Sequence, residues 1–196
     1  TASNTTGSIN STVSVNTTAG FSIVKYTGTG SAATVGHGLG VKPDMIFSKP
    51  YSTTGDWNIY HDSFSAQQRI KLNSTGAVST NSGIFSSLPT STLVNIGTSG
   101  DINANGTSHL FYCFNSVKGY SKFGKFIGNG NADGTFIYTG FKPSFILAKR
   151  TDATAGWVLF DNKRIGYNGS GNYWLDAQNN EADQTDATGM FDQLSN

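Results

Sequence analysis

The stretch GVKPDMIFSK at residues 40–49 returns 100 positions later as GFKPSFILAK at residues 140–149. Both stretches open with a glycine, continue through Lys-Pro and an apolar run, and end in a lysine. A second pair keeps the same offset, because KYTGTG at 25–30 matches KFIGNG at 125–130. Ordered matches at a constant spacing indicate an internal repeat, and the repeat predicts how the whole chain is organised.

The repeat divides the sequence into three parts. We expect an N-terminal strand or linker at residues 1–20, a first β repeat at 21–118, and a second, incomplete β repeat at 119–196. The match continues more loosely, with IFSSL at 84–88 resembling MFDQL at 190–194. The second copy then has no counterpart of the last two strands of the first. We expect further chain, a neighbouring subunit or the N-terminal segment to cover the resulting edges.

Short runs rich in Val, Ile, Phe and Tyr, bounded by Gly, Pro, Asn and Asp, predict β-strands. In the first copy the predicted strands are residues 21–27, 43–49, 57–61, 68–72, 92–96 and 108–115. In the second copy they are residues 122–127, 135–138, 143–149, 157–161 and 173–176. The segment 7–16 alternates apolar and polar residues like a further strand. Helical turns fit only 64–70 and 180–194, so the expected fold is all-β, an antiparallel β-sandwich or jelly-roll-like structure.

Composition excludes several classes of function. The 13 basic and 12 acidic residues nearly cancel, so the basic surface that nucleic-acid binding requires is not expected. No apolar stretch approaches the roughly 20 residues of a membrane helix, so we expect no membrane insertion. Cys113 is the single cysteine and cannot form an intrachain disulfide. Its apolar surroundings predict a small buried side chain.

Two polar segments could be read as metal loops. Asp101-Ile102-Asn103-Ala104-Asn105-Gly106 has the first half of a calcium-loop pattern, but position twelve of that loop is Tyr112 instead of a glutamate. Asn105-Gly106 also favours a hairpin turn, which is the interpretation we prefer. Residues 129–134 are interpreted in the same way. The histidines, His37, His61 and His109, lack the spacing of a metal site, so neither a metal nor another cofactor is expected.

The sequence favours a protein that is not an enzyme. No serine lies in a G-x-S-x-G motif. The single glutamate, Glu181, lies in a polar region, and the aspartates are more typical of turns than of a paired glycosidase site. A fragment of a glycan depolymerase is a weaker alternative, which would need two carboxylates at hydrolase distance. We therefore assign no catalytic residue.

Sugar binding is the candidate ligand chemistry. Trp57 and Trp157 occupy equivalent repeat positions and are expected in the two cores. Trp174 differs, because its rough counterpart in the first copy is Lys71, which suggests a surface position. The candidate ligand-binding residues are therefore Trp174 and its neighbours Tyr173, Asn172 and Asp176. An exposed Trp174 would support this site, whereas a buried one would argue against it.

Several phrases of the sequence resemble a repeat domain common in marine bacteriophage virion structural, tail-fibre-like proteins. They include AGFSIVKYTGTG at 19–30, VGHGLGVKPD at 35–44, GYSKFG at 119–124 and DNKRIGYN at 161–168. The resemblance covers nearly the whole chain and implies a structural protein without catalytic residues.

The expected function is a non-enzymatic structural or adhesin module of a bacteriophage virion, in a tail fibre, spike or head decoration. Its expected location is the virion. Its expected partners are copies of itself or other virion proteins, with host-surface glycans as candidate ligands. The alternative is a carbohydrate-binding module of a larger secreted or phage protein. Multivalent display on a virion would strengthen weak contacts with a host.

Overall fold

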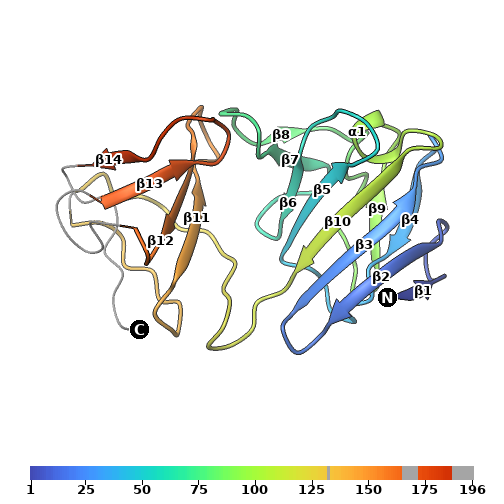
Figure 1. Ribbon diagram of the computed structural model, residues 1–196, viewed down its shortest axis with the longest axis horizontal. Coiled ribbons are helices and arrows are strands. Elements are labelled where there is room, and N and C mark those ends of the chain that lie inside the picture. Colours follow the sequence, from blue (N-terminus) through green and yellow to red (C-terminus); the bar gives the residue numbers. More distant parts are fainter. Residues whose placement is uncertain (132, 165–171, 187–196) are drawn as a thin grey trace. The chain divides into compact units, whose positions relative to one another are not determined.

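A computed structural model describes residues 1–131, 133–164 and 172–186. The regular secondary structure of the described residues consists almost entirely of antiparallel β-strands (Figure 1). It forms two compact units, the first made of residues 1–71 and 78–125, the second of 72–77 and 126–196. The predicted all-β class with antiparallel sheets is therefore confirmed.

The first unit contains two sheets and one short helix. The larger sheet has eight strands, which in spatial order are β1 (Ala2–Asn4), β2 (Ser11–Asn16), β3 (Phe21–Thr27), β10 (Ser108–Phe114), β5 (Met45–Pro50), β6 (Asn58–His61), β7 (Gln68–Lys71) and β8 (Ser79–Thr80). The smaller sheet pairs β4 (Ala33–Gly36) with β9 (Leu93–Ile96). The helical turn α1 (Gly100–Asn103) follows β9 and is capped by Ser99.

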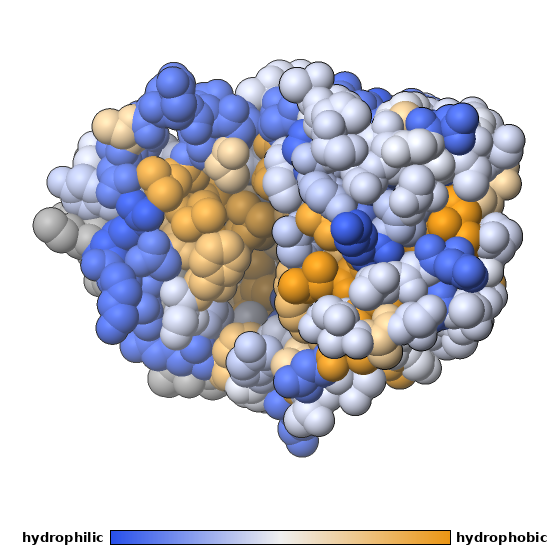
Figure 2. Space-filling model, turned by 45° about the vertical axis from the view of Figure 1, so that its right-hand side comes forward, coloured by the Kyte–Doolittle hydropathy of each residue, from blue (hydrophilic) through white to orange (hydrophobic). Residues whose placement is uncertain are grey.

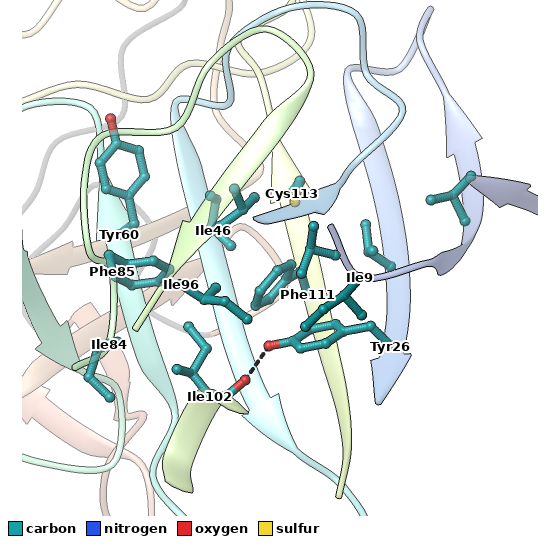
Figure 3. Packing of buried hydrophobic residues seen from close by; sticks show 14 of the residues in the cluster. Ile9, Tyr26, Ile46, Tyr60, Ile84, Phe85, Ile96, Ile102, Phe111 and Cys113 are labelled. Carbon is teal, nitrogen blue, oxygen red and sulfur yellow. Dashed lines mark hydrogen bonds between the residues drawn. The ribbon is translucent and has the colours of Figure 1, made fainter. Parts of the chain in front are cut away.

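The core of the first unit lies between the two sheets. Along each strand, alternate residues point to opposite faces, and the inward residues Val24, Ile46 and Phe111 are fully buried. The smaller sheet contributes buried apolar side chains to the same cluster: Val35, Val94 and Ile96. Figure 3 shows this packing, with the Tyr26 hydroxyl donating a hydrogen bond to the carbonyl of Ile102.

The second unit contains a four-stranded antiparallel meander. Its strands are β11 (Phe145–Lys149), β12 (Trp157–Asp161), β13 (Asn172–Asp176) and β14 (Gln184–Asp186). Their order matches that of β5, β6, β7 and β8. The registers also match, as four cross-strand pairs show: Ile46–Tyr60 with Ile146–Phe160, and Ile59–Ile70 with Leu159–Leu175. The offset is 100 residues for the first two strands and 105 for the third, so Trp174 occupies the register position of Arg69 rather than that of Lys71.

All six strands predicted in the first copy are present, within about two residues. The alternating N-terminal segment forms β2, and Ile9 makes an isolated bridge to Val35. β4 and α1 were not predicted from the sequence. The segment 64–70, which could have held a helical turn, leads instead into β7, as the strand predicted at 68–72 required. Of the other such segment, 180–194, residues Gln184–Asp186 form a strand and 187–194 lie outside the described part of the chain.

Two predicted strands of the second copy are wrong. The described residues between 115 and 144 contain no strand, although 122–127 and 135–138 have strand-like sequences. In the first unit, β3 lies between β2 and β10, and β4 pairs with β9. A strand needs such a partner for its backbone groups. No described segment of the second unit pairs with 122–127 or 135–138, so these residues stay irregular.

Candidate functional site

The four candidate ligand-binding residues lie on β13, but they do not share one face. Trp174 and Asp176 alternate with Tyr173, so Tyr173 points to the opposite side of the sheet. Trp174 is half-buried, and its ring centroid is 6.5 Å from that of Phe160 on β12. Phe160 is only 4% exposed. One side of Trp174 is therefore used for packing, and the side chain of Asn172 lies outside the described part of the chain.

The structure shows a larger aromatic surface that the sequence did not predict. It is the face of the eight-stranded sheet opposite the core, formed by β3, β10, β5 and β6, which lie side by side (Figure 1). We call it the outer face. The pairing registers arrange its side chains in three cross-strand rows. They are Phe21–Phe114–Met45–His61, then Ile23–Tyr112–Phe47–Ile59, then Lys25–Leu110–Lys49.

Aromatic rings contact one another across this outer face. The ring of Tyr112 lies between two nearly parallel rings, that of Phe21 at 6.5 Å and 8° and that of Trp57 at 6.2 Å and 24°. Trp57 directly precedes β6, and its indole reaches across β5 to meet Tyr112 on β10. Phe114 contacts Phe21 at 4.8 Å. All four rings are half-buried, whereas Ile59 in the second row is fully buried, so the outer face is partly open at its aromatic rings and closed at Ile59 on β6.

Trp57 was expected in the core, on the same basis as Trp157. Trp157 is 3% exposed, whereas Trp57 is half-buried on the outer face. The sequence carried one signal for this face. SHLFYCF at 108–114 has apolar residues at both alternating positions, which is typical of a strand with apolar surface on two sides.

Two lysines border the aromatic rows. The Lys49 ammonium lies 6.0 Å from the centre of the Trp57 ring and donates a hydrogen bond to the carbonyl of Gly55 at 2.5 Å. The Lys25 ammonium lies 5.5 Å from the ring of Tyr51, and a hydrogen bond with Lys25 is the main cause that lowers the pKa of Tyr51. Within the described residues, neither lysine has a carboxylate partner at ion-pair distance. This edge of the outer face is therefore cationic.

Two acidic groups, Asp44 and Asp62, lie at the other end of the outer face. Asp62 forms an ion pair with Lys42, and Asp44 accepts a hydrogen bond at 2.7 Å from the backbone of Ser116. Both carboxylates act on His61, whose pKa is nevertheless lowered because desolvation is the largest effect. The outer face thus has a cationic end and a more acidic end.

The buried titratable side chains of the first unit include His37, His109 and Cys113. His37 and His109 are fully buried, and desolvation lowers the pKa of both rings. His37 contacts the carbonyl of Thr90, and His109 stacks on Tyr26 at 5.3 Å. Burial raises the pKa of Cys113 to about 12, which leaves its thiol protonated at neutral pH. Cys113 belongs to the hydrophobic core cluster, His109 packs against Tyr26 of that cluster, and the His37 ring also accepts a hydrogen bond from the backbone of Leu39.

Asn103 lies in the middle of the segment that resembles half a calcium loop, and its side chain forms hydrogen bonds within the protein. The Asn103 amide donates to the carbonyls of Ser31, at 2.6 Å, and Gly97, at 2.8 Å. Its oxygen accepts from the backbone of Thr29 at 2.8 Å. Gly106 has φ +70°, which fits the turn predicted at Asn105-Gly106, although this turn joins α1 to β10 rather than two strands. Within the described residues, no group of three or more His, Cys, Asp or Glu side chains could hold a metal ion.

The second unit exposes apolar side chains where strands were predicted. Exposure ranges from 43% to 86% in this set: Phe126, Ile127, Phe136, Ile137, Tyr138 and Phe145. Phe145 belongs to β11, which among the described strands pairs with β12 alone. Figure 2 shows one side of the molecule, where hydrophobic residues form several patches among hydrophilic ones. The described part of the chain has no helix long and apolar enough to span a membrane.

Comparison with known proteins gives one result. A family model described as "Domain of unknown function (DUF7483)" matches residues 1–196. Neither the curated proteins nor the solved structures contain a match.

Proposed function

We propose a function for this chain from its own sequence and structure. The chain belongs to the DUF7483 family, a domain of unknown function, so the family assigns it no activity. It acts as a non-enzymatic structural and adhesive module of a bacteriophage virion, in a tail fibre, spike or head decoration. The observation that carries the proposal is the repetition of one β-meander. β5–β8 and β11–β14 share strand order and register. Together with the repeated phrases, this supports two tandem copies of one structural domain.

Repetition of this kind suits a protein that builds extended particles. Each copy supplies the same meander, and contacts that are weak singly gain strength when many copies are displayed together. The resemblance to phage tail-fibre-like repeats points to the virion as the place of display. The buried histidines and cysteine are used in packing, which agrees with a structural role.

The exposed edge of β11 supports self-association as part of this function. A strand with one unpaired edge offers backbone donors and acceptors to another strand. Phe145 on that strand is 57% exposed. In the first unit, the equivalent strand β5 has neighbours on both sides, β10 and β6. We propose that a strand from a neighbouring molecule occupies the corresponding place beside β11.

The second candidate function is that of a carbohydrate-binding module in a larger secreted or phage protein. The outer face favours it, because parallel aromatic rings present flat surfaces to the C–H faces of sugars. The two functions predict different oligomeric states. A virion component assembles, whereas a binding module can act alone.

Light scattering on the purified chain separates the two candidates. A stable trimer or larger assembly would support the virion module and would explain why β11 pairs with only one of the described strands. A monomer across a wide range of concentration would contradict self-association and favour the free-standing sugar-binding module.

A further inference from the structure

The geometry points to the outer face of the first unit as a binding site for an acidic polysaccharide. We infer that pyranose rings stack on Phe21, Tyr112 and Trp57, while carboxylates of the same chain pair with Lys25 and Lys49. This inference rests on the adhesive part of the proposed function. It differs from the Trp174 site, because it lies on another unit and uses other residues.

The aromatic row provides the stacking surface. Three rings follow one another in nearly parallel planes, at 6.5 Å and 6.2 Å between centroids. The C–H groups of a sugar face carry partial positive charge and are attracted to the negative faces of such rings. A row of rings at these spacings suits a chain of sugars better than one small ligand, because successive units can each meet a ring.

The lysines define the charge of the ligand. Lys25 and Lys49 occupy the same cross-strand row, on either side of Leu110, and both ammonium groups lie beside aromatic rings. Within the described residues, neither has a carboxylate partner. A carboxylate on a polysaccharide would supply that partner through a charge-assisted hydrogen bond.

The groups already near the lysines do not fill this role. Gly55 offers a neutral carbonyl to Lys49, and Tyr51 offers a hydroxyl and a ring to Lys25. The carboxylate of Asp56, which precedes Trp57, is used in an ion pair with Lys71. The acidic residues Asp44 and Asp62 lie at the opposite end of the face, where Asp62 is paired with Lys42 and Asp44 accepts a hydrogen bond from the backbone of Ser116.

The test measures binding of three polymers to the full chain by isothermal titration calorimetry. Polygalacturonate is the acidic polysaccharide, dextran the neutral one, and poly-glutamate the polyanion without sugar rings. We expect polygalacturonate to bind most tightly, and its binding to weaken as salt is raised. Lys25→Gln together with Lys49→Gln should reduce this affinity by about tenfold. The matched control Lys118→Gln removes an exposed lysine of the same unit and should leave the affinity unchanged.

The aromatic part is tested with two tryptophan variants. Trp57→Leu should abolish polygalacturonate binding, whereas Trp174→Leu, on the second unit, should preserve it. Circular dichroism verifies that both variants fold. If Trp57→Leu does not fold, the lysine variants decide alone, because Lys25 is exposed and Lys49 half-buried.

Each contrary outcome is distinct. Equal binding of poly-glutamate would show simple polyanion attraction, and loss of binding in Trp174→Leu would place the site on β13. Either result would overturn the inference. Tight binding of dextran alone would overturn the acidic ligand class while leaving an adhesive function intact. Failure of all three polymers to bind would overturn the site, whereas the structural half of the proposed function depends on the assembly measured by light scattering.

Discussion

Asn103 joins α1 to two backbone segments, the sequence-distant loop at 29–31 and the nearby residue Gly97. Its side chain makes hydrogen bonds to Thr29, Ser31 and Gly97, and it is fully buried. A buried amide with all these partners stabilises the loops at one end of the first unit. The calcium-like pattern around Asn103 is therefore compatible with a structural role, which spacing alone could not reveal.

Asn103→Ala should lower the free energy of unfolding by about 2–4 kcal/mol, because three hydrogen bonds are lost at a buried position. Urea denaturation followed by circular dichroism measures the change. The control is Asn105→Ala, two residues away and exposed, which should change stability by less than about 0.5 kcal/mol. Equal effects of the two substitutions would contradict the role assigned to Asn103.

His109 should make the stability of the first unit depend on pH. Desolvation lowers its pKa in the folded state, so the unfolded chain binds a proton more readily. Stability is then complete above the unfolded pKa of about 6.5 and is lost as the pH falls through the folded pKa. His109→Phe keeps a ring against Tyr26 and removes the titrating group.

We expect the difference in unfolding free energy between pH 7 and pH 5 to be smaller in His109→Phe than in the natural chain. Urea denaturation at the two pH values measures it. His37 and His61 have lowered pKa values as well, so part of the pH dependence should remain. An unchanged difference would show that His109 is not a source of this dependence.

At the scale of the strands, the cover over each position, and not alternation alone, decides which side chains are buried. On β2, Val13 is 5% exposed and belongs to the core cluster, whereas Val15 is 43% exposed. Both residues point to the same side of the strand, so the difference comes from what covers each position. Both residues pair with β3, but Val13 lies opposite Val24 of the core cluster, whereas Val15 lies opposite Ser22.

Val13→Thr and Val15→Thr form a matched pair of substitutions. Val13→Thr places a hydroxyl in the core and should reduce the free energy of unfolding by about 1–3 kcal/mol. Val15→Thr should change it by less than about 0.5 kcal/mol. Thermal and urea denaturation of the two variants compare them directly. A larger loss from Val15→Thr would mean that Val15 is covered by something outside the described contacts.

The sequence predicted strands well where their partners are present in the chain. Local propensity identified β3, β5 and β10, which lie together in the centre of one sheet. It failed at 122–127 and 135–138, because those segments have suitable residues but no described strand beside them. Propensity describes a single segment, whereas a strand also requires backbone partners.

The candidate ligand site shows a similar limit. The sequence singled out Trp174 for its difference between the two copies, and the structure leaves that residue half-buried against Phe160. It could not reveal the outer face, because Trp57 and Tyr112 are 55 positions apart and meet only through the pairing of three strands. Proximity of this kind follows from sheet order, which no local pattern contains.

At the scale of the whole molecule, the question is how the exposed apolar residues of the second unit are covered. Isolated exposed hydrophobic residues are common, but a group of them beside an unpaired strand edge marks an interaction site. Phe145 combines both features, because it belongs to β11 and is 57% exposed. A strand from a neighbouring molecule paired with β11 would extend the meander into a sheet shared by two molecules.

Phe145→Lys should therefore weaken self-association while preserving the fold, because a lysine at a strand edge disfavours pairing with another chain. Light scattering over a range of concentration measures the mass, and circular dichroism verifies the β-structure. The control is Tyr120→Lys, which adds the same charge at an aromatic residue of the first unit that is 68% exposed and lies in a turn. Dissociation of the Phe145 variant alone would assign assembly to β11. Equal masses for both variants and the natural chain would exclude this edge and require that another surface joins the molecules.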